Sequence, residues 1–96
     1  MPTSLIKFEV QLIEADNGSP VDIAQKNFLQ SLGTISTVYR YATWSFDSSG
    51  NYTQYTSCYG LINSSQASTA LSYLNTLNTA LGTTVPCISY TVNQQP

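Results

Sequence analysis

The sequence predicts an α+β domain in which two helices cover one face of a four-stranded antiparallel sheet. Segments with alternating apolar residues and segments with helical apolar spacing follow one another in the order strand, helix, strand, strand, helix, strand. A chain of 96 residues is long enough for one hydrophobic core and too short for two. We therefore expect a single domain over residues 1–96, with an ordered core of about 4–92 and a flexible tail over 93–96.

The first strand and the first helix have the clearest signals. Every second residue is apolar over 6–12, which predicts a half-buried strand. Ser19 is a suitable N-cap before Pro20, and apolar residues then recur at three- and four-residue spacing. A helix is therefore expected over about 20–32, and Gly33 is placed to end it.

A hairpin and a second helix are expected next. Two segments rich in aromatic and β-branched residues, near 35–46 and 52–62, are separated by the turn sequence DSSGN. Such a pair is typical of two antiparallel strands joined by a short turn. The apolar stripe that follows predicts a helix that begins near Asn63 and ends at Gly82.

The last segment and the order of the elements determine the expected topology. A final strand over 85–92 belongs at the edge of the sheet, because Pro86 cannot donate a ladder hydrogen bond. Right-handed crossovers then give a split βαβ arrangement with the first and third strands in the centre. This order resembles the ferredoxin-like α/β plait over nearly the whole chain. That fold hosts many unrelated functions, so the resemblance implies an architecture and no active site.

The helices leave one face of this sheet uncovered, and the alternation of side chains along each strand predicts which residues lie there. The residues expected on the uncovered face are Lys7, Glu9 and Gln11 of the first strand, Tyr52, Gln54 and Cys58 of the third, and Cys87, Ser89 and Thr91 of the last. Those expected toward the helices are Tyr55, Tyr59 and Leu61 of the third strand and Pro86, Ile88, Tyr90 and Val92 of the last. The second strand fits two registers: Ile35, Tyr39 and Tyr41 point outward if Val38, Ala42, Trp44 and Phe46 face the helices, and the opposite register exchanges them.

The composition argues against two classes of partner. Charged residues make up only 8% of the chain, and 13 Ser, 12 Thr, 7 Asn and 7 Gln supply most of its polar surface. Three basic residues cannot neutralise a row of phosphates or bind an anionic membrane, so neither nucleic acid nor a membrane is an expected partner. The N-terminal segment has no signal-peptide pattern, which predicts a cytoplasmic location and leaves a virion or non-classical export open.

Few residues in the chain support catalysis or metal binding. The sequence has no histidine, which removes the commonest general base and metal ligand. Glu9 is the only carboxylate in a predicted strand, where it could pair loosely with Lys7. The segment EADNG at 14–18 lacks the spacing of a calcium loop. No cofactor or metal is expected, and an enzyme is disfavoured.

Cys58 and Cys87 are predicted to be free thiols. The first lies late in the third strand and the second early in the fourth, so both are near the same end of the sheet. The first strand should lie between them, and two strand spacings of about 9.5 Å exceed the limit of roughly 7 Å between bridged Cα atoms.

The aromatic hairpin leads to two functional hypotheses, besides the plain interpretation that tyrosines are good strand formers. Uncharged, tyrosine-rich surfaces are typical of the centres of protein interfaces. The first hypothesis is a non-enzymatic protein that associates with itself, as a homodimer or larger assembly, or with another protein, in an accessory, viral or structural role. Its interface candidates are Tyr39, Tyr41, Tyr52 and Gln54.

The second hypothesis is a small-molecule-binding protein, or an enzyme similar to the cofactor-free oxygenases and isomerases of the plait fold. Its pocket candidates are Arg40, Trp44, Tyr55 and Tyr59. Arg40 is the only arginine of the chain, and inside a core it would need an anionic or carbonyl partner.

Overall fold

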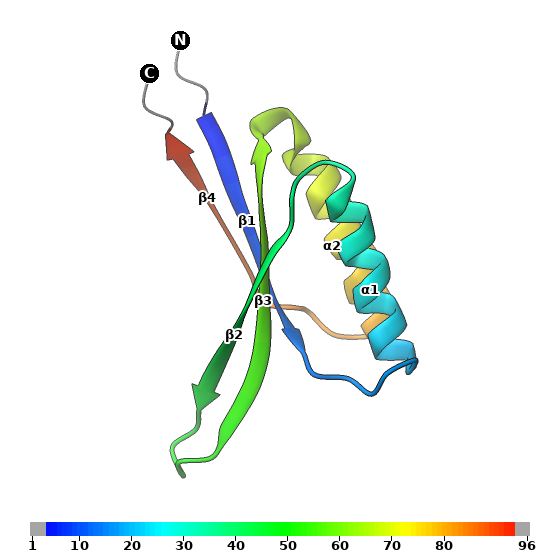
Figure 1. The fold of residues 1–96 in the computed structure, drawn as a ribbon, viewed down its shortest axis with the longest axis vertical. Helices are drawn as coiled ribbons and strands as arrows, with labels where there is room; N and C mark the ends of the chain where they lie inside the picture. Colours follow the sequence, from blue (N-terminus) through cyan, green and yellow to red (C-terminus); the bar gives the residue numbers. More distant parts are fainter. Residues whose placement is uncertain (1–3, 94–96) are drawn as a thin grey trace.

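The computed structural model describes residues 4–93, which form one antiparallel sheet and two helices packed on one of its faces (Figure 1). The strands are β1 (Ser4–Ile13), β2 (Tyr39–Phe46), β3 (Tyr52–Asn63) and β4 (Cys87–Asn93), and the helices are α1 (Pro20–Gly33) and α2 (Ala67–Leu81). The strand order is β2-β3-β1-β4, so the two predicted central strands are central. The fold is an α+β plait, as the order of elements indicates.

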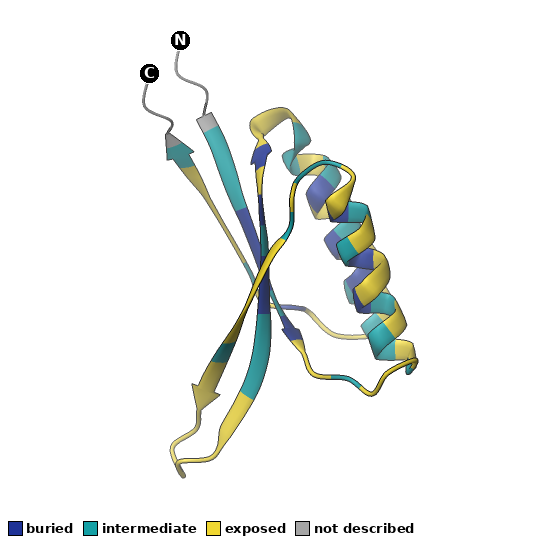
Figure 2. Ribbon diagram, viewed as in Figure 1, coloured by how far each residue is buried: buried dark blue, intermediate teal, exposed yellow. Residues whose placement is uncertain are grey.

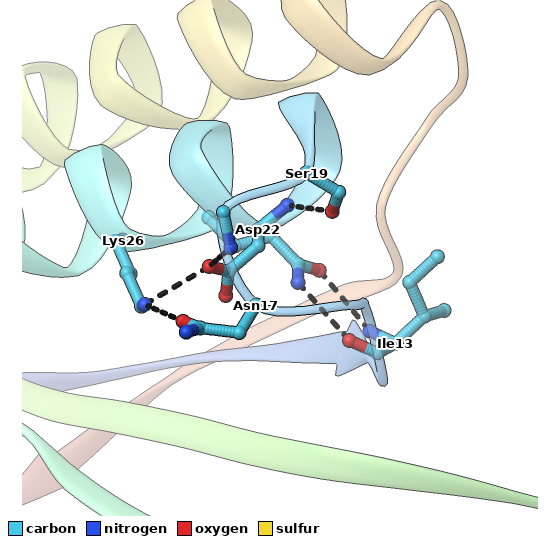
Figure 3. Close-up of polar contacts among 7 residues, drawn as sticks. Ile13, Asn17, Ser19, Asp22 and Lys26 are labelled. Carbon is cyan, nitrogen blue, oxygen red and sulfur yellow. Dashed lines mark hydrogen bonds and ion pairs between the residues drawn. The ribbon is translucent and has the colours of Figure 1, made fainter.

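The predicted start of α1 is confirmed (Figure 3). Ser19 is the N-cap, and its Oγ accepts a hydrogen bond of 3.2 Å from the backbone N of Asp22. The Asp22 carboxylate accepts one from the backbone N of Gly18 at 2.8 Å and pairs with Lys26 at 2.9 Å. These contacts hold the pKa of Asp22 below its usual value, the Gly18 hydrogen bond contributing most.

A buried glutamine, Gln25, connects α1 to the end of β1 at Ile13, which Figure 3 labels. The Gln25 amide group donates to the backbone O of Ile13 at 3.0 Å, and its carbonyl oxygen accepts from the backbone N of the same residue at 3.2 Å. This pair of hydrogen bonds satisfies the backbone of the last β1 residue where the ladder stops. It also fixes the position of the helix against the strand.

The core lies between the sheet and the helices, and Figure 2 shows buried segments on the side of the helix layer that faces the strands. The buried apolar residues are Phe8, Val10, Leu12, Phe28, Leu32, Cys58, Ile62, Ala70, Leu74, Leu77 and Val85. The even-numbered residues of β1 and the helical apolar stripes therefore meet as the sequence predicts. Neither helix in residues 4–93 is long and apolar enough to cross a membrane.

The second strand begins at Tyr39 rather than near residue 35, which corrects the predicted boundary. Residues 35–38 form an irregular connection that passes over Gly60 of β3. A Cβ added at Gly60 would lie 2.5 Å from Ser36 Oγ and 2.9 Å from Ser36 Cβ. This close approach needs a glycine in β3 and ends the pairing of the two strands.

The other boundaries differ from prediction by a few residues. A 3₁₀ turn over Ser64–Gln66 precedes α2, and the Asn63 backbone N donates to Gln66 Oε1 at 3.0 Å. Gly82 caps α2 with φ 70°, as expected for a left-handed C-cap. The last strand begins at Cys87 and includes Asn93, which was expected in the tail; residues 94–96 of that predicted tail lie outside the described residues.

The β2–β3 hairpin extends beyond the helices (Figure 1), and its far end is exposed (Figure 2). Its turn is held by Asp47, whose carboxylate accepts hydrogen bonds from the backbone N of Ser49 and of Asn51. Gly50 supplies the positive φ of 83° that the turn requires. The aromatic side chains near this end, those of Trp44, Phe46 and Tyr52, are all exposed.

Candidate functional site: the open face of the sheet

The face of the sheet away from the helices is the candidate site, and we call it the open face. Strand alternation and the pairing register place on it Lys7, Glu9, Gln11 and Ile13 of β1, Tyr39, Tyr41 and Thr43 of β2, Tyr55, Ser57, Tyr59 and Leu61 of β3, and Ile88 and Tyr90 of β4. Within residues 4–93, no helix lies on this side.

The register corrects the faces predicted for β3. Phe8 of the core is opposite Gly60, and Val10 is opposite Cys58, so the even-numbered residues of β3 face the helices. Cys58 is fully buried in the core instead of lying on the uncovered face. Tyr55, Tyr59 and Leu61, which were expected toward the helices, lie on the open face.

The faces predicted for β4 are also exchanged. Tyr90 is opposite Lys7 and Ile88 is opposite Glu9, so Ile88, Tyr90 and Val92 point away from the helices. Cys87, Ser89 and Thr91 share the helix side, where Ser89 and Thr91 are exposed. The prediction failed because it placed the apolar side of β4 toward the helices, whereas the pairing with β1 turns that side away from them.

Glu9 occupies the centre of the open face and is nevertheless 9% exposed. Tyr59 and Ile88 flank it on the two neighbouring strands. The Tyr41 hydroxyl donates a hydrogen bond to Glu9 Oε2, and Lys7 Nζ lies 3.8 Å from Oε1. The expected Lys7–Glu9 pair is therefore present, together with a hydroxyl donor from β2.

Tyrosine rings cover the Lys7 side of this pair. Lys7 Nζ lies 4.5 Å from the centre of the Tyr59 ring and 5.7 Å from that of Tyr90. The pKa of Lys7 is above its usual value, first because of its hydrogen bond with the Tyr90 hydroxyl and further because of the nearby Glu9 carboxylate. The pKa of Tyr41 is also raised, chiefly by its hydrogen bond to Glu9. Lys7 therefore remains a cation and Tyr41 a neutral donor at neutral pH.

The aromatic rings of β2 and β3 pack against each other on the same face. Tyr39 and Tyr59 are stacked with ring centres 5.2 Å apart, and Tyr41 meets Tyr59 edge-on at 6.2 Å. Beside this cluster is a hollow of about 180 Å³ that Thr43, Ser57 and Glu9 help to line. In residues 4–93, Thr43 Oγ1 is the one buried side-chain polar atom without a hydrogen-bond partner.

The four predicted interface residues divide between the two faces. Tyr39 and Tyr41 lie on the open face beside Tyr59, in the register in which Val38, Ala42, Trp44 and Phe46 are on the helix side. Tyr52 is opposite Phe46 and Gln54 is opposite Trp44, so both lie on the helix side of the hairpin beyond the helices. Placing them on the uncovered face was wrong, because the register is set by Gly60 and Cys58.

The four predicted pocket residues do not line one cavity. Arg40 is opposite Cys58 and Trp44 is opposite Gln54, which places both on the helix side of β2. Tyr55 and Tyr59 lie on the open face. Arg40 is exposed on the edge strand rather than enclosed beside the tryptophan.

Both cysteines are free, as predicted from the strand order. Val10 of β1 is opposite Cys58 on one side and Cys87 on the other, so a strand separates the thiols. Burial raises the pKa of Cys58 to about 11 and that of Cys87 in the same direction. Residues 4–93 contain no cluster of three His, Cys, Asp or Glu side chains that could hold a metal ion.

Sequence reasoning missed the β4 contribution to the open face, Ile88 and Tyr90, and the burial of Glu9. The apolar alternation of β4 was visible, but hydrophobicity was interpreted as facing the helices. The proline near its start indicated an edge strand, but it did not indicate which side of that strand faces the helices.

The sheet order and the two helices on one face define a protein of the ferredoxin-like α+β plait class. A solved structure, that of a DUF3240 family protein from Shewanella baltica OS155, is similar over 100% of this chain and 97% of that chain, with a TM-score of 0.62 and 12% sequence identity. At this identity the likeness supports the fold alone. Neither models of known families nor curated protein sequences match the chain.

Proposed function

We propose that the protein is a non-enzymatic self-association module in which a second copy of the chain covers the open face. The observation that carries the proposal is the orientation of β4. Its apolar residues Ile88 and Tyr90 point away from the helices, while Ser89 and Thr91 lie on the helix side. In the single chain Ile88 and Tyr90 remain 58% and 48% exposed, whereas a strand at an interface buries its apolar side.

The chemistry of the open face suits a protein partner. Apolar and aromatic side chains are exposed on all four strands, among them Ile13, Tyr39, Leu61, Ile88 and Tyr90. Tyrosine rings supply contact area with little loss of side-chain entropy, and their hydroxyls can bond across an interface. The Thr43 hydroxyl has no partner within residues 4–93 and lies at a hollow that a partner group could fill.

The charges of the open face are already paired within one chain. The Lys7 and Glu9 side chains are 23% and 11% exposed, so most of their desolvation has occurred on folding. Covering the pair further therefore costs less than burying two hydrated ions. A second copy is also a suitable partner because a two-fold axis brings the same rings and hydroxyls against themselves.

The oligomeric state of matched lysine variants tests the proposal. Ile88→Lys introduces a charge on the open face, and Ile23→Lys introduces the same charge on α1 at a similar exposure, 58% against 50%. Ile88 is opposite Glu9, so the new lysine is compatible with the folded sheet. Light scattering coupled to size-exclusion chromatography should give an oligomer for the wild type and for Ile23→Lys.

The Ile88→Lys variant should dissociate, with a dissociation constant raised by about 100-fold or more, because the interface would have to bury a second cation beside Glu9, whose charge Lys7 already compensates. Circular dichroism checks that both variants keep the fold. A wild-type monomer at high concentration contradicts the proposal, and so does equal dissociation of the two variants.

A further inference from the structure

A groove on the opposite side of the molecule gathers two of the three basic residues of the chain. It has a volume of about 520 Å³ and lies between α1 and the start of β2, where its lining includes Lys26, Leu29, Gly33, Thr37, Val38 and Arg40. An adjoining hollow of about 160 Å³ shares Lys26, Leu29 and Arg40 with it and reaches Cys58 of the core. The groove volume is within the range of small-molecule sites, about 300–1,000 Å³.

The side chain of Arg40 has no hydrogen-bond or ion-pair partner among residues 4–93. The ion pairs of this part of the chain are Lys7–Glu9 and Lys26–Asp22. Lys26 is therefore already neutralised, and it also donates to Asn17 Oδ1 at 3.1 Å. The groove carries one uncompensated positive charge, that of the Arg40 guanidinium.

The surroundings of Arg40 combine this charge with an apolar wall. Leu29 and Val38 pack against the core and line the groove, and Thr37 is also part of its lining. A guanidinium group binds a carboxylate through two parallel hydrogen bonds. One net charge matches a monoanion, whereas phosphates are bound by several cationic or backbone donors.

We propose that the Arg40 groove binds a small carboxylic acid with an apolar body, the carboxylate on Arg40 and the body along Leu29 and Val38. This site lies on the helix side of the sheet and is independent of the open face. Association of two chains through the open face leaves it accessible, so the two proposals fail separately.

Hexanoate is a suitable probe, and two-dimensional amide NMR spectra of the full chain during its titration provide the test. Saturable shifts are expected at the backbone amides of the groove, those of Gly33, Thr37, Val38 and Arg40. Acetate carries the charge alone and hexanol the apolar body alone. Each should bind at least about tenfold more weakly than hexanoate, since acetate buries no apolar chain and hexanol makes no charge-assisted hydrogen bond.

Two variants of the groove arginine complete the experiment. Arg40→Gln should weaken hexanoate binding about tenfold or more, and Arg40→Lys, which keeps the positive charge, should weaken it less. The spectra themselves show whether each variant is folded. Equal binding by Arg40→Gln and wild type, equal binding of hexanol and hexanoate, or tighter binding of inorganic phosphate would each overturn the proposal, as would the absence of saturable shifts.

Discussion

Along β1, the side chains that face the helices and those that face away share one backbone and differ in how they are buried. Phe8, Val10 and Leu12 are covered by the helices. Glu9, between them in sequence, is buried on the open face by its neighbours within the sheet, with Lys7 and Tyr41 satisfying its charge. The helices cover the first face as a separate layer, whereas on the second face only the neighbouring side chains of the sheet cover Glu9.

This difference teaches that burial on the two faces has different physical origins. On the helix side, apolar side chains leave water, and their contribution grows with the area that the helices remove from solvent. On the open face, ring stacking and charge pairing exclude water around one carboxylate while the surrounding rings stay exposed. Substitutions should therefore have unequal effects on the two faces.

The largest expected effect is on the covered face. Phe8→Ala should lower the free energy of unfolding by about 3–5 kcal/mol, because it removes a fully buried ring and leaves a cavity. Gln11→Ala, on the open face of the same strand, should change it by no more than about 0.5 kcal/mol. Urea denaturation of the two variants measures both values. Similar losses would mean that the two faces of β1 contribute equally.

A smaller effect is expected at Gly60, where the chain crosses the covered face. Gly60→Ala should cost about 1–3 kcal/mol, because the new Cβ would lie 2.5 Å from Ser36 Oγ. Adding Ser36→Gly should restore part of the loss in thermal or urea unfolding. Gly33→Ala is the control, because a Cβ at this position meets no atom within 4 Å. It should raise the free energy of unfolding by about 0.4–1 kcal/mol, since alanine lowers the conformational entropy of the unfolded chain. If Gly60→Ala left the free energy of unfolding unchanged, the connection over β3 would be able to move away from the new Cβ.

The smallest effect is a shift in ionisation on the open face. The pKa of Tyr41 is raised above 10.0, so the folded state favours its neutral hydroxyl. This stabilisation is complete below pH 10 and is lost as the pH rises through the raised pKa of Tyr41. The pKa values of Lys7 and Cys58 are also raised, so their contributions to stability likewise decrease at high pH. Ultraviolet difference titration of wild type against Tyr41→Phe should show the late-ionising tyrosine. Glu9→Gln should move its ionisation to lower pH, and an unchanged titration in that variant would exclude Glu9 as the main cause.

The sequence determined the elements and the order in which they pack. Three signals depend only on contacts within a few residues and could therefore be predicted from short segments of sequence. They are the alternation over 6–12, the Ser19 cap followed by Pro20, and the Gly82 C-cap. The strand order followed from these elements together with the handedness of their connections. The free state of the two cysteines then followed from the strand order.

The tertiary structure decided which side of β3 and β4 faces the helices and how the open face is composed. Both parities of β3 contain large side chains, so hydrophobicity could not choose between them; the close passage of Ser36 over Gly60 and the pairing of Cys58 with Val10 did. The outward orientation of Ile88 depends on the register in which β4 pairs with β1, where Ile88 is opposite Glu9. Such pairings join residues far apart in the chain, and no local pattern encodes them.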